Sequence, residues 1–236
     1  PVHRTNCRVA LSLLLLPWLE VAIGLSLLGA LCISRLRDPN RAARWALAFT
    51  GIVLACTFLV WLGSYLHISF EQPSFFARPL LQVDELSAPL IPAVALLHFL
   101  TTLATTRTKM RRFSFSWSLT NESLRLAIFG CQEPWVLIGL LILSVIPPYF
   151  ELINRGKPTR IYVLHMVLFG SLLVLGWSVV EVEGKLSEHS VWSTVPLLAA
   201  ILVRCGMVPF HCWLTDWLEH ASFGIALLFV APLSGV

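Results

Sequence analysis

Arg204 is the residue whose setting points most directly to chemistry. It follows the apolar stretch Ala199–Val203 and comes shortly before Gly206 and Pro209. Proline lacks a backbone donor and clashes with the preceding turn, so this pattern predicts a broken helix. At membrane depth, broken helices are tolerated where they line a hydrated cavity or are buried in protein, and a cation there indicates an ion path. The alternative is that Arg204 snorkels to the nearby cytoplasmic interface.

Other ionisable side chains also lie within apolar stretches, where each costs at least about 2.5 kcal/mol on insertion scales. Glu122 and Arg125 are three residues apart, a spacing that favours an ion pair on one helical face. The pair is either structural or part of a proton path. His165 lies in a later apolar stretch, where a lone histidine is more often a hydrogen-bonded packing residue than a proton carrier.

Two short His–acid combinations follow the expected break: His211 with Asp216, and His220 with Glu219. Such pairs can hold a metal, but no third convergent ligand is visible, so no metal site is predicted. The six cysteines form no CxxC pair, which indicates neither a metal centre nor a disulfide framework.

The amino-acid composition indicates whether the elements that position these residues are surrounded by water or by lipid. Of the 236 residues, 57% are hydrophobic and 13% are charged. Soluble domains average roughly 45–50% hydrophobic and about 25% charged residues. A water-soluble globule is therefore excluded, and an all-α polytopic membrane protein is predicted. The net charge of +4 is only mildly basic and does not favour a nucleic-acid partner.

Apolar runs long enough to cross a bilayer, which needs roughly 20 residues per helix, predict about seven transmembrane helices. The fourth is the weakest, because Asn121, Glu122 and Arg125 lie inside it. An eighth run begins at Ser222 and is cut off, so residues 1–236 are expected to be a single transmembrane domain from a longer protein. The seven runs are 9–33, 45–66, 86–106, 113–131, 135–153, 161–180 and 191–208.

The loops between these runs alternate in charge. Basic residues follow the first, third and fifth runs, whereas the intervening loops are mainly acidic. By the positive-inside rule the basic loops are cytoplasmic and the N-terminus is outside.

Residues 203–216, V-R-C-G-M-V-P-F-H-C-W-L-T-D, resemble the signature of a known family. It comprises the antiporter-like, proton-conducting membrane subunits of respiratory complex I (NADH:quinone oxidoreductase) and the related multi-subunit cation/proton antiporters. There a lysine followed by P-x-H-x-W-L-P-D marks a broken seventh helix. The sequence V-D-E-L-S at 83–87 is a weaker match. The resemblance implies that Gly206, Pro209 and Trp213 build the break, and that Arg204, His211 and Asp216 line a proton or ion path.

The sequence departs from the family at its charged positions. The family lysine falls on Arg204, whose guanidinium keeps its proton near neutral pH. The family glutamate of helix five, aligned through Pro147, falls on an apolar position near Ile142. The family lysine of helix six has no counterpart, and the nearest polar side chain is His165. Glu122 with Arg125 is a possible substitute pair.

The resemblance implies a membrane subunit of a complex I-type assembly that contributes to proton or cation translocation. No flavin, iron–sulfur or nicotinamide motif is present, so no cofactor is expected and quinone reduction would occur elsewhere. Expected partners are other membrane subunits, the lipid bilayer and soluble redox or other coupling subunits. The expected location is a bacterial inner membrane or an equivalent energy-coupling membrane. Two alternatives are a subunit of a cation/proton antiporter or inorganic-carbon uptake complex, and a degenerate, non-conducting structural subunit.

Overall fold

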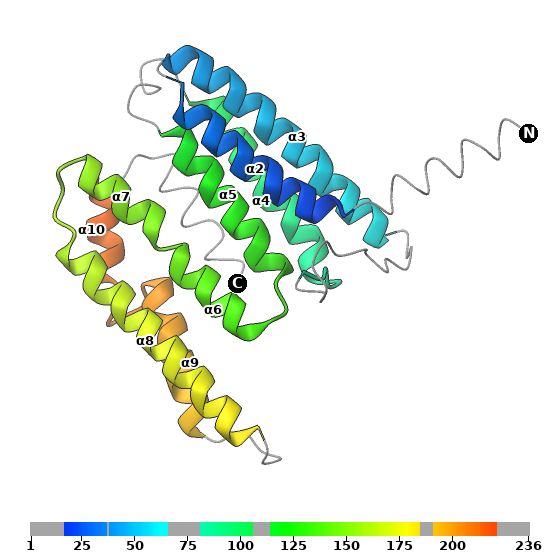
Figure 1. Ribbon diagram of the computed structural model, residues 1–236. Helices are drawn as coiled ribbons and strands as arrows, with labels where there is room; N and C mark the ends of the chain where they lie inside the picture. Colours follow the sequence, from blue (N-terminus) through cyan, green and yellow to red (C-terminus); the bar gives the residue numbers. More distant parts are fainter. Residues whose placement is uncertain (1–16, 37, 66–80, 106–113, 185–190, 221–236) are drawn as a thin grey trace, which may run out of the picture. The chain divides into compact units, whose positions relative to one another are not determined.

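The computed structural model describes residues 17–36, 38–65, 81–105, 114–184 and 191–220, and these residues are largely helical (Figure 1). Apart from helices, this part of the chain holds one isolated β-bridge, between Leu81 and Cys131. The predicted eighth run, 222–236, lies outside the described residues. The helices are α2 (Trp18–Ser34), α3 (Pro39–Tyr65), α4 (Ser87–Ala104), α5 (Phe115–Gly130), α6 (Pro134–Leu143), α7 (Ile146–Asn154), α8 (Arg160–Glu183), α9 (Val191–Cys205) and α10 (Cys212–His220).

The contacts divide the chain into two compact units. The N-terminal unit ends at Leu137 and the C-terminal unit begins at Ile138. This boundary falls inside α6, so it does not coincide with a loop or linker.

In the N-terminal unit the described helices α2, α3, α4 and α5 pack as a bundle. Helix α2 packs against α3 and α5, and α4 packs against the same two helices. The hydroxyl of Ser116 at the start of α5 donates to the carbonyl of Ala30 in α2 at 2.9 Å. The core of this unit is apolar and comes from all four helices: Leu19, Ala22, Val53, Cys56, Val60, Ile91, Ala95 and Leu126.

The C-terminal unit is organised around α8, which packs against both α9 and α10. Helices α8 and α9 approach closely at Gly176, where an added Cβ would lie 2.7 Å from the side chain of Leu197. Among the described residues of this unit lie two apolar clusters. One contains Ile138, Phe169, Leu173, Ala200 and Val203, and the other contains Leu152, Tyr162, Met166, Trp213 and Trp217.

The helices correct the predicted number of membrane spans. In the described part of the chain, four helical segments are long and apolar enough to cross a membrane: Pro39–Tyr65, Ser87–Ala104, Pro134–Asn154 and Arg160–Glu183. Helices α2 and α9 are apolar but have only 17 and 15 residues. At 1.5 Å per residue both are shorter than a core of about 30 Å. The count of about seven spans is therefore not supported, although the chain fits an integral membrane protein.

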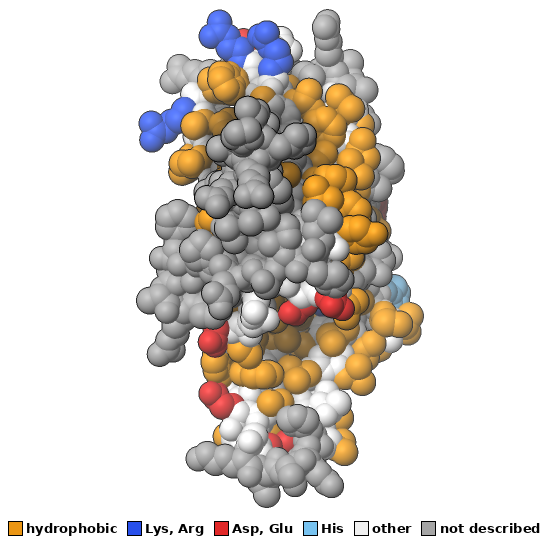
Figure 2. Space-filling view, turned by 90° about the vertical axis from the view of Figure 1, so that its right-hand side faces the viewer, with side chains coloured by type: hydrophobic (Ala, Val, Ile, Leu, Met, Phe, Trp, Pro, Cys, Tyr) orange, Lys and Arg blue, Asp and Glu red, His pale blue; other side chains and the backbone are white. Residues whose placement is uncertain are grey.

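The outer surfaces of the helices agree with a membrane setting. Many large apolar side chains are exposed on α3, α4 and α8, among them Phe58, Leu103 and Leu164. On the face drawn in Figure 2, hydrophobic side chains cover much of the described surface. Hydrocarbon around these helices would remove this apolar area from contact with water.

The predicted single helix 135–153 is interrupted. Helix α6 ends at Leu143 and α7 begins at Ile146, with Ser144 and Val145 forming a turn between them. Pro147 and Pro148 supply no backbone N–H, so the carbonyls of Leu143 and Ser144 lose their α-helical donors. The proline pair therefore explains the break.

Candidate functional site

The predicted break in the seventh helical segment is present. Helix α9 ends at Cys205, and α10 begins at Cys212. Gly206 has a φ of 63°, its N–H donates to the carbonyl of Val203, and the N–H of Met207 donates to that of Leu202. This is the Schellman arrangement, which favours glycine because it requires a left-handed backbone. A Cβ at Gly206 would also lie 2.9 Å from the Leu214 side chain, so both the backbone conformation and the packing require glycine.

Trp213 fixes the other side of the break. Its indole Nε1–H donates to the carbonyl of Val203 at 2.8 Å, and the side chain is fully buried. This bond links α10 to the last turn of α9. The exposed Pro209, which follows a cis peptide bond, lies in the intervening turn. The residues that the resemblance assigned to the break therefore occupy it.

Arg204, in the last turn of α9, is held by residues from two other segments. Its Nη2 donates to the hydroxyl of Ser144 at 3.1 Å, and its Nη1 lies 3.5 Å from the sulfur of Met166. The guanidinium carbon lies 5.4 Å from the ring centroid of Phe169, a cation–π distance. The guanidinium also interacts with the hydroxyl of Tyr162.

The contacts of Arg204 with α8 lie near the N-terminal end of that helix. Its partners on α8 lie two to nine residues from Arg160, or about 3 to 14 Å along the helix. Helix α10 extends for nine residues beyond the break. The side chain therefore reaches across to α8 and to the turn between α6 and α7, and the chain continues as a helix after the break.

The α6–α7 break faces the same guanidinium. Ser144 accepts from Arg204, and the adjacent carbonyl of Val145 accepts from the Tyr162 hydroxyl at 2.9 Å. Tyr162 in turn packs edge-on against Trp213, with ring centroids 5.9 Å apart. Two interrupted helical segments thus meet around Arg204 and Tyr162, and they supply backbone and hydroxyl oxygens beside a fixed cation.

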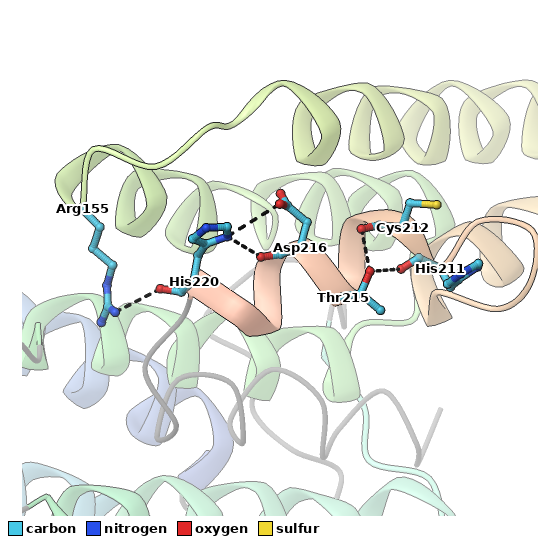
Figure 3. Close-up of polar contacts among 6 residues, drawn as sticks. All are labelled: Arg155, His211, Cys212, Thr215, Asp216 and His220. Atoms are coloured by element: carbon cyan, nitrogen blue, oxygen red, sulfur yellow. Dashed lines mark hydrogen bonds and ion pairs between the residues drawn. The ribbon is translucent and has the colours of Figure 1, made fainter.

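The predicted His211 lies in the turn between α9 and α10, and the predicted Asp216 lies on α10 (Figure 3). His211 is exposed in the turn, and its carbonyl accepts from the Thr215 hydroxyl at 3.4 Å. Asp216 is 3.6 Å from Nδ1 of His220. The carbonyl of His220 accepts from Arg155 at 3.2 Å, and Arg155 pairs with Glu151 at 2.8 Å. A chain of polar contacts therefore ties the end of α10 to the end of α7.

Two positions derived from the family comparison do not contact Arg204. Ile142 is 40% exposed and lies two residues before Ser144, the residue that occupies the contact. His165 bonds through Nδ1 to the carbonyl of Ile161 at 2.8 Å within its own helix. Its neighbour Met166 is the one that touches Arg204.

Glu122 and Arg125 both lie buried in α5, in the N-terminal unit. The carboxyl oxygens of Glu122 have no hydrogen-bond partner among the described residues, and no ion pair joins them to Arg125. His98 on α4 is fully buried, and Arg125 acts on it electrostatically. The spacing of Glu122 and Arg125 thus permits a pair that the fold does not form.

Ser144, Tyr162, Met166 and Phe169 contact Arg204, and sequence reasoning selected none of them. Tyr162, Met166 and Phe169 fall at intervals of four and three residues, the spacing of one helical face, but this pattern also describes ordinary core packing. Within the described residues, no group of three or more potential metal ligands lies together. No protein-family model and no curated protein matches the chain.

Proposed function

We propose that the chain is a membrane subunit of a complex I-type NADH:quinone oxidoreductase assembly and contributes to proton or cation translocation. It would belong to the antiporter-like subunit family, with redox chemistry carried out by soluble partner subunits. Its location would be a bacterial inner membrane or an equivalent energy-coupling membrane, with the N-terminus outside. The resemblance of residues 203–216 to the family signature and the geometry around Arg204 support this proposal.

One observation carries the proposal: Arg204 lies where two interrupted helical segments meet. Its guanidinium donates to Ser144 at the α6–α7 break and belongs to the last turn before the α9–α10 break. Interrupted helices inside a membrane protein expose backbone oxygens that can stabilise water or ions. A permanent cation at that point sets the electrostatic potential that a moving proton or cation encounters.

In this mechanism Arg204 does not itself release a proton, because an arginine stays charged at neutral pH. It repels a nearby cation and favours the charged form of an acid. Its field therefore controls when neighbouring groups take up and release protons. His211, in the turn between α9 and α10, and Asp216, on α10, would line the cytoplasmic part of the route. Glu122, Arg125 and His165 stay candidates for other parts of the path.

A second function is that of a non-conducting structural subunit. The sequence favours it, because the family lysine falls on Arg204 and the family glutamate of helix five falls on an apolar position near Ile142. An antiporter or an inorganic-carbon uptake complex is a further assembly in which the same subunit would serve.

The test is proton uptake by vesicles that carry the assembled complex with full-length protein. We expect Arg204→Ala to abolish most of the uptake, and Arg204→Lys, which keeps the charge, to preserve it. Arg35→Gln is the control, because Arg35 is exposed on the N-terminal unit. Unchanged uptake in a normally assembled Arg204→Ala complex would establish the structural role. Quinone-reductase activity in the purified complex would support the complex I-type assembly, whereas a carbonic-anhydrase-like partner without such activity would support the uptake complex.

A further inference from the structure

An apolar groove of about 680 Å³ runs along α8 on its side toward α6 and α7. Val163, Val167, Gly170 and Val174 on α8 line it, spaced three or four residues apart as on one helical face. From Tyr162 to Leu175 the lining extends thirteen residues, about 20 Å at 1.5 Å per residue. One leaflet of a bilayer core is about 15 Å thick, so the groove has the length of an acyl chain from one leaflet.

Two tyrosines line the groove at the end where α7 turns into α8, and Ser171 lines it further along α8. Tyr149 and Tyr162 line that end, and Arg160 lies one turn before Val163 on the same face of α8. Lys157 precedes it in the turn. Both basic side chains are exposed, and neither forms an ion pair with a described residue. Arg155 differs, since it is bonded to Glu151 and to the His220 carbonyl.

We propose that this groove binds one anionic glycerophospholipid, with an acyl chain along Val163, Val167 and Gly170 and the headgroup phosphate on Lys157 and Arg160. The charge at the end of the groove selects the occupant, because basic residues at the cytoplasmic surface attract anionic headgroups by about 1 kcal/mol each. A zwitterionic lipid would fill the apolar part equally well but would gain less at the basic end.

The site shares two side chains with the surroundings of Arg204. Tyr162 and Met166 line the groove and also contact the guanidinium. A bound acyl chain would therefore lie against the residues that hold the cation in place. The lipid proposal itself does not depend on whether the chain conducts protons.

The experiment is native mass spectrometry of the full-length protein equilibrated with equal amounts of phosphatidylglycerol and phosphatidylcholine. We expect the protein to retain one phosphatidylglycerol molecule. In Lys157→Gln and in Arg160→Gln, the preference for phosphatidylglycerol over phosphatidylcholine should be about fivefold weaker for each charge removed. Arg35→Gln with Arg44→Gln is the charge-matched control, because both arginines are exposed in the N-terminal unit. Equal retention of the two lipids, or an equal loss in the control, would overturn the proposal.

A second variant tests the groove itself. Gly170→Leu would place a side chain in the lining, and its Cβ would meet Ile142 at 3.6 Å, an ordinary contact. We expect reduced retention of both lipids at an unchanged melting temperature, with Gly170→Ala intermediate. Full retention in Gly170→Leu, or a helix of a neighbouring subunit seated in the groove of the assembled complex, would refute the site.

Discussion

The guanidinium of Arg204 donates to the hydroxyl of Ser144 at 3.1 Å, across 60 residues of sequence. This bond connects the last turn of α9 to the turn between α6 and α7, so the two interrupted segments are held together at a charged point. Ser144 is itself buried, and its hydroxyl donates to the carbonyl of Leu141 at 2.6 Å. The serine thus has a fixed orientation, with its oxygen available to the arginine.

Removing this hydroxyl tests how much the connection contributes. Ser144→Ala removes an acceptor from a charged donor, a loss of about 1.5–3 kcal/mol when such bonds are buried. We expect a lower free energy of unfolding, measured by denaturant titration in detergent. Ser171→Ala is the matched control, because Ser171 is exposed on α8 and its hydroxyl donates to the carbonyl of Leu168 in its own helix. An equal change in both variants would show that the Arg204–Ser144 bond contributes nothing specific.

Gly206 provides a test of the break. Gly206→Ala would put a Cβ on a residue with φ of 63°, and 2.9 Å from Leu214. The backbone strain alone costs about 1 kcal/mol or more, and Leu214 must also shift. We expect a lower melting temperature and, in the assembled complex, lower proton uptake. Gly139→Ala, at a helical glycine with nothing within 4 Å of the added Cβ, should leave both unchanged. A stable, active Gly206→Ala protein would contradict the described geometry.

The sequence predicted the α9–α10 break but not the α6–α7 break, although both contain proline. The helix-disrupting residues Gly206 and Pro209 closely follow a recognisable cation, Arg204. Pro147 and Pro148 instead lie inside an apolar run, and hydropathy measures the length of such a run but does not register lost backbone donors. The proline pair was the available signal. The contacts of Arg204 with α8 had no local signal, since Met166 lies 38 residues away in sequence.

Glu122 and Arg125 illustrate a different limit of sequence reasoning. Three residues in a helix correspond to an angular offset of about 60°, which permits an ion pair but does not require one. Whether the side chains meet depends on the helices packed around α5, and these come from distant parts of the chain. Burial of both residues, at 0% and 8% exposure, follows from that packing.

Glu122 offers a test that separates a structural carboxyl from one on an ion path. Glu122→Gln replaces the carboxyl with an uncharged amide of similar shape. Because neither carboxyl oxygen has a hydrogen-bond partner among the described residues, we expect the melting temperature to be kept or raised. Proton uptake by the assembled complex should fall. Glu133→Gln, at an exposed position, is the control for loss of one negative charge. A normal rate of uptake in Glu122→Gln would remove Glu122 from the path.

The segment Pro134–Asn154 allows a direct test of membrane crossing, because charged, exposed residues lie just outside both of its ends. Glu133 precedes α6, and Lys157 follows α7. If the interrupted segment spans the bilayer, Glu133→Cys and Lys157→Cys will react with an impermeant maleimide from opposite sides. By the positive-inside rule, Lys157→Cys should react from the cytoplasmic side.

These variants belong in a cysteine-free background, because native Cys131 lies close to the first site. Burial raises the pKa of the Cys131 thiol, and a smaller thiolate fraction at a given pH makes it react more slowly. Cys131 is therefore a poor reporter of maleimide access on the side of Glu133. Labelling of both introduced cysteines from one side would show that α6 and α7 form a re-entrant hairpin. In that case Ser144 and Arg204 would meet where the segment turns back, and the proposed route past them would not cross the bilayer.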